Sequence, residues 1–114
     1  MANPVWDGVV TYLTWVTTST NSFNVPAGTG AVTFILPDFA TDTTTQLEGL
    51  DPFDRTTWRA VEAYDPAGGV ADEVILAEST YTVVPASAIG LGTFRLTNVS
   101  SQAGLIATVL IDRI

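Results

Sequence analysis

Residues 102–113 have the sequence QAGLIATVLIDR, and this stretch constrains the fold more than any other. Side chains alternate between the two faces of an extended chain. In such a chain one face would carry Leu105, Ala107, Val109 and Ile111, and the other Ile106 and Leu110. A strand that is apolar on both faces is an aggregation hazard at an exposed sheet edge. We therefore expect this strand to lie in the middle of a sheet or at an interface.

Segments that precede this stretch in the chain also have sequences typical of strands. The predicted strands are residues 9–16, 23–25, 31–36, 43–50, 58–64, 74–77, 81–84 and 92–98. Turns rich in Pro, Gly and Asp separate many of them, and only residues 38–43 and 85–91 could hold a helical turn. Short runs at a spacing of roughly ten residues are typical of antiparallel sandwiches and barrels.

The predicted fold is therefore all-β: a single-domain antiparallel β-sandwich, Greek-key or jelly-roll-like, with about eight strands. A length of 114 residues supports one domain. Residues 1–20 would form an N-terminal arm and the first strand, and residues 21–114 the body of the sandwich.

Composition excludes several classes of function. The chain has 12 acidic residues against 4 Arg, a net charge of -8, and no Lys, His or Cys. Zinc, haem and iron–sulfur sites built on His or Cys are thereby excluded, as are His- or Cys-dependent nucleophiles. The acidic balance argues against binding nucleic acid. No segment has the pattern of a secretory signal or the length of a membrane helix, so we expect a soluble protein made in a cytoplasm.

The surface must be covered by something other than charge. Only 14% of the residues are charged and 46% are hydrophobic, whereas about 25% charged residues is usual. The 18 Thr and 6 Ser residues can line solvent faces. Part of the apolar excess would be buried against a partner or in a homo-oligomer, since symmetric oligomers hide such surface.

Carboxylates are the remaining catalytic groups. Glu48 with Asp51 and Asp54, and Asp72 with Glu73, are the candidate pairs for glycosidase chemistry. Asp51 and Asp54 sit in a Pro-containing turn, where Asp is favoured because it bonds to the nearby backbone. We therefore expect no enzyme and no catalytic residues.

Calcium is the one cofactor that the sequence allows. Asp65, Asp72 and Glu73 bracket a Gly-rich turn, and carboxylates with loop carbonyls are ligands that Ca²⁺ prefers. Their spacing matches no EF-hand, so a calcium site here is the lesser alternative to no cofactor at all.

Aromatic residues supply the candidate contacts with a partner. Most occupy strand positions and are expected in the core. Trp6 and Phe53 are exceptions, in the N-terminal arm and in a turn, and Trp and Phe are common interface anchors. With Pro4 and Val5 of the arm, they form the predicted partner-contact set.

The order of several segments carries a family resemblance. FNVPAG at 23–28, AVTF at 31–34, TWR at 57–59 and GTFRL at 92–96 follow one another in the chain. This order resembles small all-β virion structural modules of tailed bacteriophages, of the capsid decoration or cement type. The resemblance implies a virion protein without catalysis, which stabilises the head by contacting the major capsid protein or another virion protein. A homo-oligomer such as a trimer would suit that role.

Two alternatives stay open at this stage. A carbohydrate- or receptor-binding module of a tail fibre or spike would show a shallow groove with two exposed aromatics beside an acid. A carboxylate hydrolase would need two carboxyl groups roughly 5 to 9.5 Å apart in a cleft.

Overall fold

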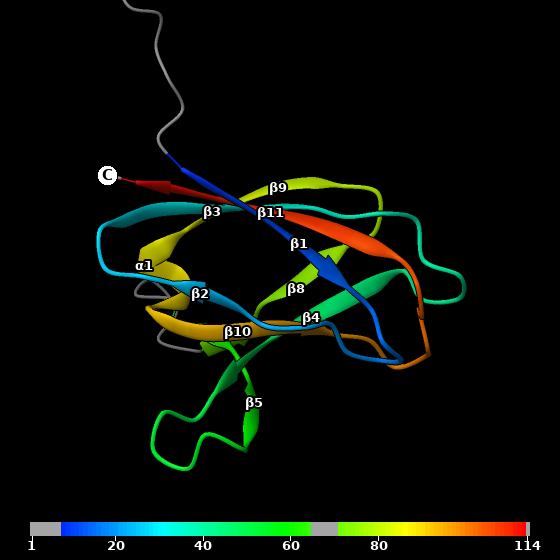
Figure 1. Cartoon of the computed structure of the whole chain (residues 1–114), viewed down its shortest axis with the longest axis horizontal. Coiled ribbons are helices and arrows are strands. Elements are labelled where there is room, and N and C mark those ends of the chain that lie inside the picture. The colour runs from blue at the N-terminus through cyan, green and yellow to red at the C-terminus, as the bar shows by residue number, and fades with distance from the viewer. Residues whose placement is uncertain (1–7, 65–70, 114) are drawn as a thin grey trace, which may run out of the picture.

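Two antiparallel sheets face each other in the computed structural model, which describes residues 8–64 and 71–113 (Figure 1). The upper sheet of Figure 1 has the strand order β1-β11-β3-β9, and the lower sheet has the order β2-β10-β4-β5, with β8 also paired to β4. The upper strands are β1 (Val9–Thr14), β11 (Ile106–Arg113), β3 (Thr29–Ile35) and β9 (Tyr81–Pro85). The lower strands are β2 (Phe23–Val25), β10 (Gly92–Thr97), β4 (Thr44–Leu50), β5 (Trp58–Ala60) and β8 (Ile75–Ala77).

The chain alternates between the sheets as it proceeds. It enters the upper sheet with β1, crosses to the lower with β2, returns with β3 and crosses again with β4; β8, β9, β10 and β11 repeat the alternation. Each sheet is four strands wide, with β5 and β8 both paired to β4 in the lower sheet. Two such sheets connected in this way form a jelly roll. The predicted all-β sandwich is confirmed, and its topology is the jelly-roll version.

One predicted strand is divided in the structure. Residues 58–64 form β5 and β6 (Glu62–Tyr64), and β6 pairs with β7 (Ala71–Glu73) in a separate two-stranded sheet. The break falls at Val61, whose N–H donates to Leu47 O at 2.9 Å while its carbonyl accepts from Val74 N–H at 2.8 Å. Leu47 N–H in turn donates to Val74 O at 3.0 Å. At this junction the chain leaves the lower sheet while the backbone N–H and C=O of Val61 remain hydrogen-bonded. Because residues 58–64 form two strands, the number of strands is greater than the eight that were predicted.

The inner faces of the two sheets form the core. In β11 the side chains of Ala107, Val109 and Ile111 are buried, as the alternation predicted, and the strand lies between β1 and β3 in the middle of its sheet. Phe34 of β3 is fully buried and meets the ring of Phe23 edge-on at 5.8 Å. The central position of β11 also confirms the expectation drawn from its two apolar faces.

A buried polar pair closes one end of the core. Trp15 follows β1, and its indole Nε1 donates to Asn98 Oδ1 at 3.0 Å. The Trp15 ring meets Phe39 edge-on at 5.3 Å. A buried indole N–H needs a partner, and Asn98 supplies it.

Helical structure is confined to one short segment of the described residues. The helix α1 (Ala86–Ile89) lies in the predicted stretch 85–91, whereas residues 38–43 contain no helix. None of the helical residues in the described ranges forms a segment long and apolar enough to cross a membrane.

Candidate interaction surfaces

The outward face of the upper sheet is the most unusual surface of the molecule. We call the residues on it the upper face. They are Val10, Tyr12 and Thr14 of β1, Ile106, Thr108 and Leu110 of β11, Ala31, Thr33 and Ile35 of β3, and Tyr81, Val83 and Pro85 of β9. Strand register aligns them in rows, such as Tyr12–Thr108–Ile35–Tyr81 and Val10–Leu110–Thr33–Val83. Neither row contains a charged side chain.

Several large apolar or aromatic side chains of the upper face are exposed. The exposed fractions are 65% for Tyr12, 65% for Tyr81, 58% for Val83, 54% for Ile106 and 45% for Val10. Asp112, at the end of β11, is the charged residue that shares this face in the described part of the chain. Contiguous apolar patches are rare on monomeric proteins and mark interaction sites. The upper face is therefore a candidate docking surface on a chain of net charge -8.

The outward face of the lower sheet has the opposite character. Arg95 Nε lies 2.9 Å from Glu48 Oε1, and the Arg95 guanidinium stacks 4.3 Å from the centre of the Trp58 ring. Polar side chains of Thr44, Gln46, Thr93 and Thr97 occupy neighbouring positions. This pattern is ordinary for a sheet that faces water on one side. The described charged residues of the two outward faces are therefore concentrated on the lower one, with Asp112 at the end of β11 the exception on the upper face.

Tyr12 and Tyr81 correct a prediction from the sequence. Aromatics at strand positions were expected in the core, and Trp15, Phe23, Phe34 and Phe94 are indeed buried. The two tyrosines are exposed because they point away from the lower sheet. The one signal in the sequence was the lack of charge in residues 9–16 and 81–85.

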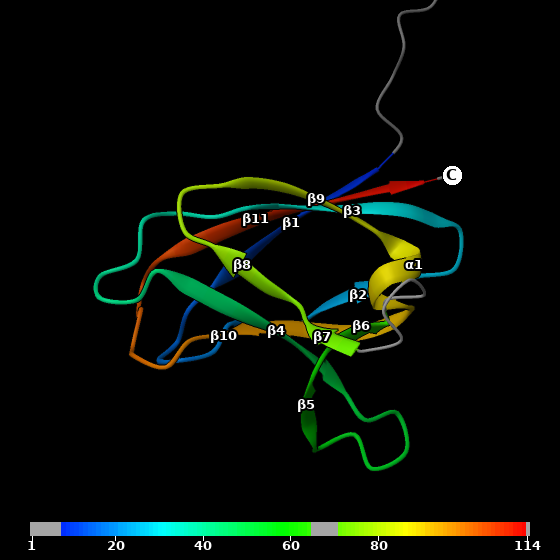
Figure 2. The same cartoon turned by 180° about the vertical axis from the view of Figure 1, so that it is seen from behind.

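The loop at residues 51–57 carries Phe53, which is 96% exposed. This loop joins β4 to β5 and projects below the lower sheet, on the side opposite the upper face (Figures 1 and 2). Asp51 Oδ1 accepts a hydrogen bond from Phe53 N–H at 2.9 Å, and Asp54 Oδ1 accepts from the N–H groups of Thr56 and Thr57 at 2.9 and 3.0 Å. The carboxylates of Asp51 and Asp54 thus stabilise the turn by accepting hydrogen bonds from backbone N–H groups. The Phe53 side chain is exposed to solvent from this hydrogen-bonded loop.

These bonds hold the pKa of Asp54 at about 2, below its ordinary value of 3.8, mainly through the backbone N–H of Thr56 and the side chain of Thr57. Because the folded-state pKa is the lower one, the carboxylate stabilises the loop above about pH 4, and this contribution is lost as the pH falls toward 2. We expect an NMR titration of the Asp54 carboxyl carbon to give a midpoint near 2. Thr57→Val should move the midpoint upward; a midpoint near 3.8 in the unmodified protein would contradict the loop geometry.

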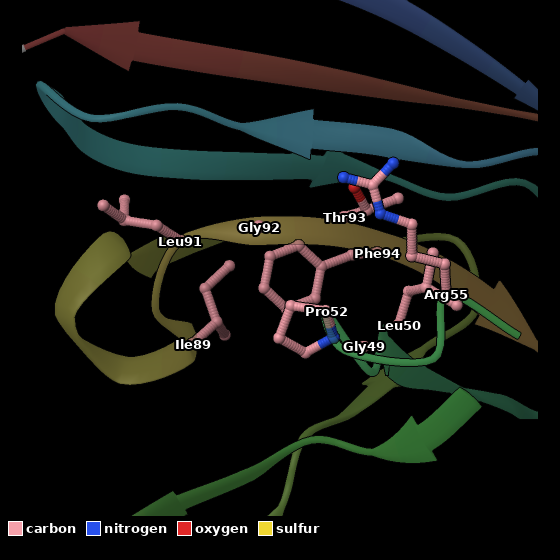
Figure 3. A pocket seen from close by; sticks show the side chains of 9 residues that line it. All are labelled: Gly49, Leu50, Pro52, Arg55, Ile89, Leu91, Gly92, Thr93 and Phe94. Atoms are coloured by element: carbon pink, nitrogen blue, oxygen red, sulfur yellow. The ribbon is translucent and has the colours of Figure 1, made fainter. Parts of the chain in front are cut away.

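A cavity of about 500 Å³ lies between this loop and the segment that joins α1 to β10 (Figure 3). Its lining comprises Gly49, Leu50, Pro52, Arg55, Ile89, Leu91, Gly92, Thr93 and Phe94. Figure 3 shows the Phe94 ring and Pro52 at the cavity, and Arg55 and Thr93 are further lining residues. The Thr93 hydroxyl is already bonded to Asn24 Oδ1 at 2.7 Å. Among the described residues that line the cavity there is no carboxylate, so these residues do not supply the acid pair of a glycosidase.

The arrangement expected of a sugar platform is not found in this cavity either. Among the aromatic side chains whose burial the structure describes, Tyr12, Phe53 and Tyr81 are exposed, and none of them lines this cavity. The carboxylates beside Phe53 are occupied by backbone N–H groups.

Several predicted site residues lie outside the described residues. These are Pro4, Val5 and Trp6 of the contact set and Asp65 of the calcium set. Asp72 and Glu73 are exposed neighbours in β7, so their side chains point to opposite faces of that strand. Across the described ranges, no group of three or more acidic side chains gathers closely enough to hold a metal. The calcium site stays a prediction that depends on Asp65.

Comparison with known proteins gives a likeness in fold. No protein-family model matches the chain, and no curated protein is similar to it. A solved structure, described as the crystal structure of SPBc2 prophage-derived protein YomS, superposes with a TM-score of 0.61 at 10% sequence identity, over 97% of each chain. At that identity the comparison establishes that the two chains share a fold over nearly their whole length.

Proposed function

We propose that this protein is a non-enzymatic structural component of a tailed-phage virion that binds the assembled capsid shell as a decoration protein. The upper face is the observation that carries the proposal, because it offers a partner rows of exposed apolar and aromatic side chains in which no charged side chain stands. The partner would be the major capsid protein or another virion protein, and the protein would reside in the virion. Shell contacts of this kind would stabilise the head without any chemistry.

Two further observations support a phage origin. A solved structure that shares the fold over 97% of both chains is described as that of a prophage-derived protein. The sequence itself resembles small virion modules in the order of its segments at 23–28, 31–34, 57–59 and 92–96.

The distribution of charge fits docking through the upper face. The chain carries -8 overall, and the rows of the upper face that lack charged side chains are where another protein can approach without desolvating carboxylates. The projecting loop with Phe53 lies on the opposite side, so it would point away from a shell that binds the upper face (Figure 1). Phe53 as a contact residue stays a prediction.

The proposal is tested by mixing the purified protein with phage particles that lack it and sedimenting the particles. We expect saturable binding at a fixed ratio to the shell subunits. A protein that stays in the supernatant at all concentrations would overturn the proposal, and binding to a glycan array instead would favour the receptor-binding alternative.

The salt dependence of shell binding distinguishes an apolar contact from an electrostatic one, because salt screens interactions between charges. Because the rows of the upper face between Val10 and Tyr81 contain no charged side chain, we expect the dissociation constant for shells to change by less than about threefold between about 0.1 and 1 M sodium chloride. Sedimentation at the two salt concentrations measures this. Loss of binding at the higher concentration would show that charged residues elsewhere make the contact.

A further inference from the structure

The cavity beside the loop at residues 51–57 has walls that are mostly apolar (Figure 3). Leu50, Pro52, Ile89, Leu91 and Phe94 supply these walls. Sites for small molecules usually have volumes of about 300 to 1,000 Å³ and apolar walls, with a few polar groups that fix the orientation of the ligand. The volume of about 500 Å³ lies in that range, so the polar groups of the cavity determine which ligand it suits.

Arg55 is the one charged residue among the described residues that line the cavity. Two other arginines of the chain are paired, since Arg59 Nη2 lies 3.5 Å from Asp51 Oδ2 and Arg95 Nε lies 2.9 Å from Glu48 Oε1. The Arg55 side chain forms no ion pair with any described residue. Its guanidinium is therefore free to bind an anion from outside the chain.

The loop fixes the backbone of Arg55 and keeps its own carboxylates occupied. Arg55 N–H donates to Asp51 O at 2.9 Å. Asp51 Oδ1 accepts from Phe53 N–H at 2.9 Å, and Asp54 Oδ1 accepts from Thr56 N–H at 2.9 Å. Both acids are thus bonded to the backbone of the turn, and neither forms an ion pair with Arg55.

Thr93 adds a backbone donor to the same cavity. Leu96 exchanges hydrogen bonds with Thr20, at 2.9 Å through its carbonyl and at 3.1 Å through its N–H, on the side of β10 away from β4. Backbone groups alternate in direction along an antiparallel strand, so the odd-numbered residues of β10 direct theirs toward β4. The register with β4 ends at Phe94 opposite Gly49. Thr93 N–H therefore points to the β4 side beyond the last pair.

We propose that this cavity binds a monocarboxylate with a compact apolar body, either a free organic acid or the C-terminus of a peptide that ends in an apolar residue. The carboxylate accepts charge-assisted hydrogen bonds from the Arg55 guanidinium, whose planar pair of donors matches its two oxygens, and a further bond from Thr93 N–H. The apolar body lies against Ile89, Leu91 and Phe94.

The lining favours a carboxylate over a phosphate. The described residues of the cavity offer a phosphate no second cation, and the apolar walls would leave several of its oxygens without donors. The inference does not depend on shell binding, because none of the residues of the upper face lines this cavity.

The test is a titration of the isotopically labelled protein with hexanoate, followed through its backbone amide signals by NMR. We expect saturable shifts of the Gly92 and Thr93 signals, with a dissociation constant that is roughly millimolar, as usual for a ligand this small. Acetate lacks the apolar body and hexanamide lacks the charge, so both should bind about tenfold or more weakly. N-acetylglycylleucine, compared with its C-terminal amide, tests a peptide terminus in the same way.

Arg55→Gln should weaken hexanoate binding by about tenfold or more, because the charge-assisted bonds are lost. Arg59→Gln makes the same chemical change on an arginine that is not among the described lining residues, and should change the affinity by less than about threefold. Leu91→Asp, at a side chain that is 59% exposed, places a carboxylate on the wall and should weaken binding at least as much as Arg55→Gln.

The site would be overturned by three results. These are the absence of saturable shifts with hexanoate and with N-acetylglycylleucine, equal affinity for the acids and their amides, and undiminished binding by Arg55→Gln. Tighter binding of the peptide acid would support the site with a chain terminus as its occupant, and tighter binding of hexanoate would support it with a free acid. Shell binding is measured separately by sedimentation, so the two proposals can fail independently.

Discussion

Replacing Phe34 with alanine is expected to lower the free energy of unfolding by about 3 to 5 kcal/mol, the usual cost of deleting a buried Phe side chain. Phe34 is fully buried in β3, and its ring meets Phe23 edge-on at 5.8 Å between the two sheets. The surrounding strands are hydrogen-bonded on both sides of β3, so they cannot collapse to fill the cavity. Urea unfolding followed by tryptophan fluorescence measures the change.

Phe53→Ala is the matched control, because the same ring is removed from a side chain that is 96% exposed. Its free energy of unfolding should stay within about 0.5 kcal/mol of the unmodified protein. Equal losses for the two variants would contradict the assignment of Phe34 to the core and of Phe53 to the projecting loop.

A charge on the upper face should abolish shell binding. Val83→Glu places a carboxylate in the row Val10–Leu110–Thr33–Val83, at a position that is 58% exposed in the free protein. Folding should tolerate it, whereas the bound state would bury an unpaired charge, which costs several kcal/mol. We expect the affinity for shells lacking the protein to fall by about a hundredfold or more.

Ile75→Glu provides the control on the other outward face. Ile75 is also β-branched, is 54% exposed, and lies on β8 opposite Gln46 of the lower sheet. Affinity for shells should change by less than about threefold. If Ile75→Glu abolished binding and Val83→Glu did not, the lower sheet would be the contact surface and the proposed orientation would be wrong.

The fold followed from alternation in the sequence where one face of each strand had to be buried. In β11 the positions of Ala107, Val109 and Ile111 predicted the inward face, and its second apolar face predicted the central position. The division of residues 58–64 could not be predicted, because it depends on a hydrogen-bond junction among Leu47, Val61 and Val74, which are distant in sequence.

The interaction surface was predicted less well than the fold. The turn roles of Asp51 and Asp54 follow from local chemistry and are confirmed by their bonds to the loop backbone. The exposure of Tyr12 and Tyr81 depends on which face of the upper sheet the lower sheet covers, and that is a tertiary property. Periodicity identifies that a strand has two faces, but only the packing of the sheets determines which one stays open.

The orientation of the protein on the shell tests the account most directly. Electron cryomicroscopy of shells loaded with the protein would show which surface meets the capsid. We predict that the β1-β11-β3-β9 sheet lies against the shell and that the loop at 51–57 points outward. Density with the loop against the shell and the upper face exposed to solvent would contradict the account.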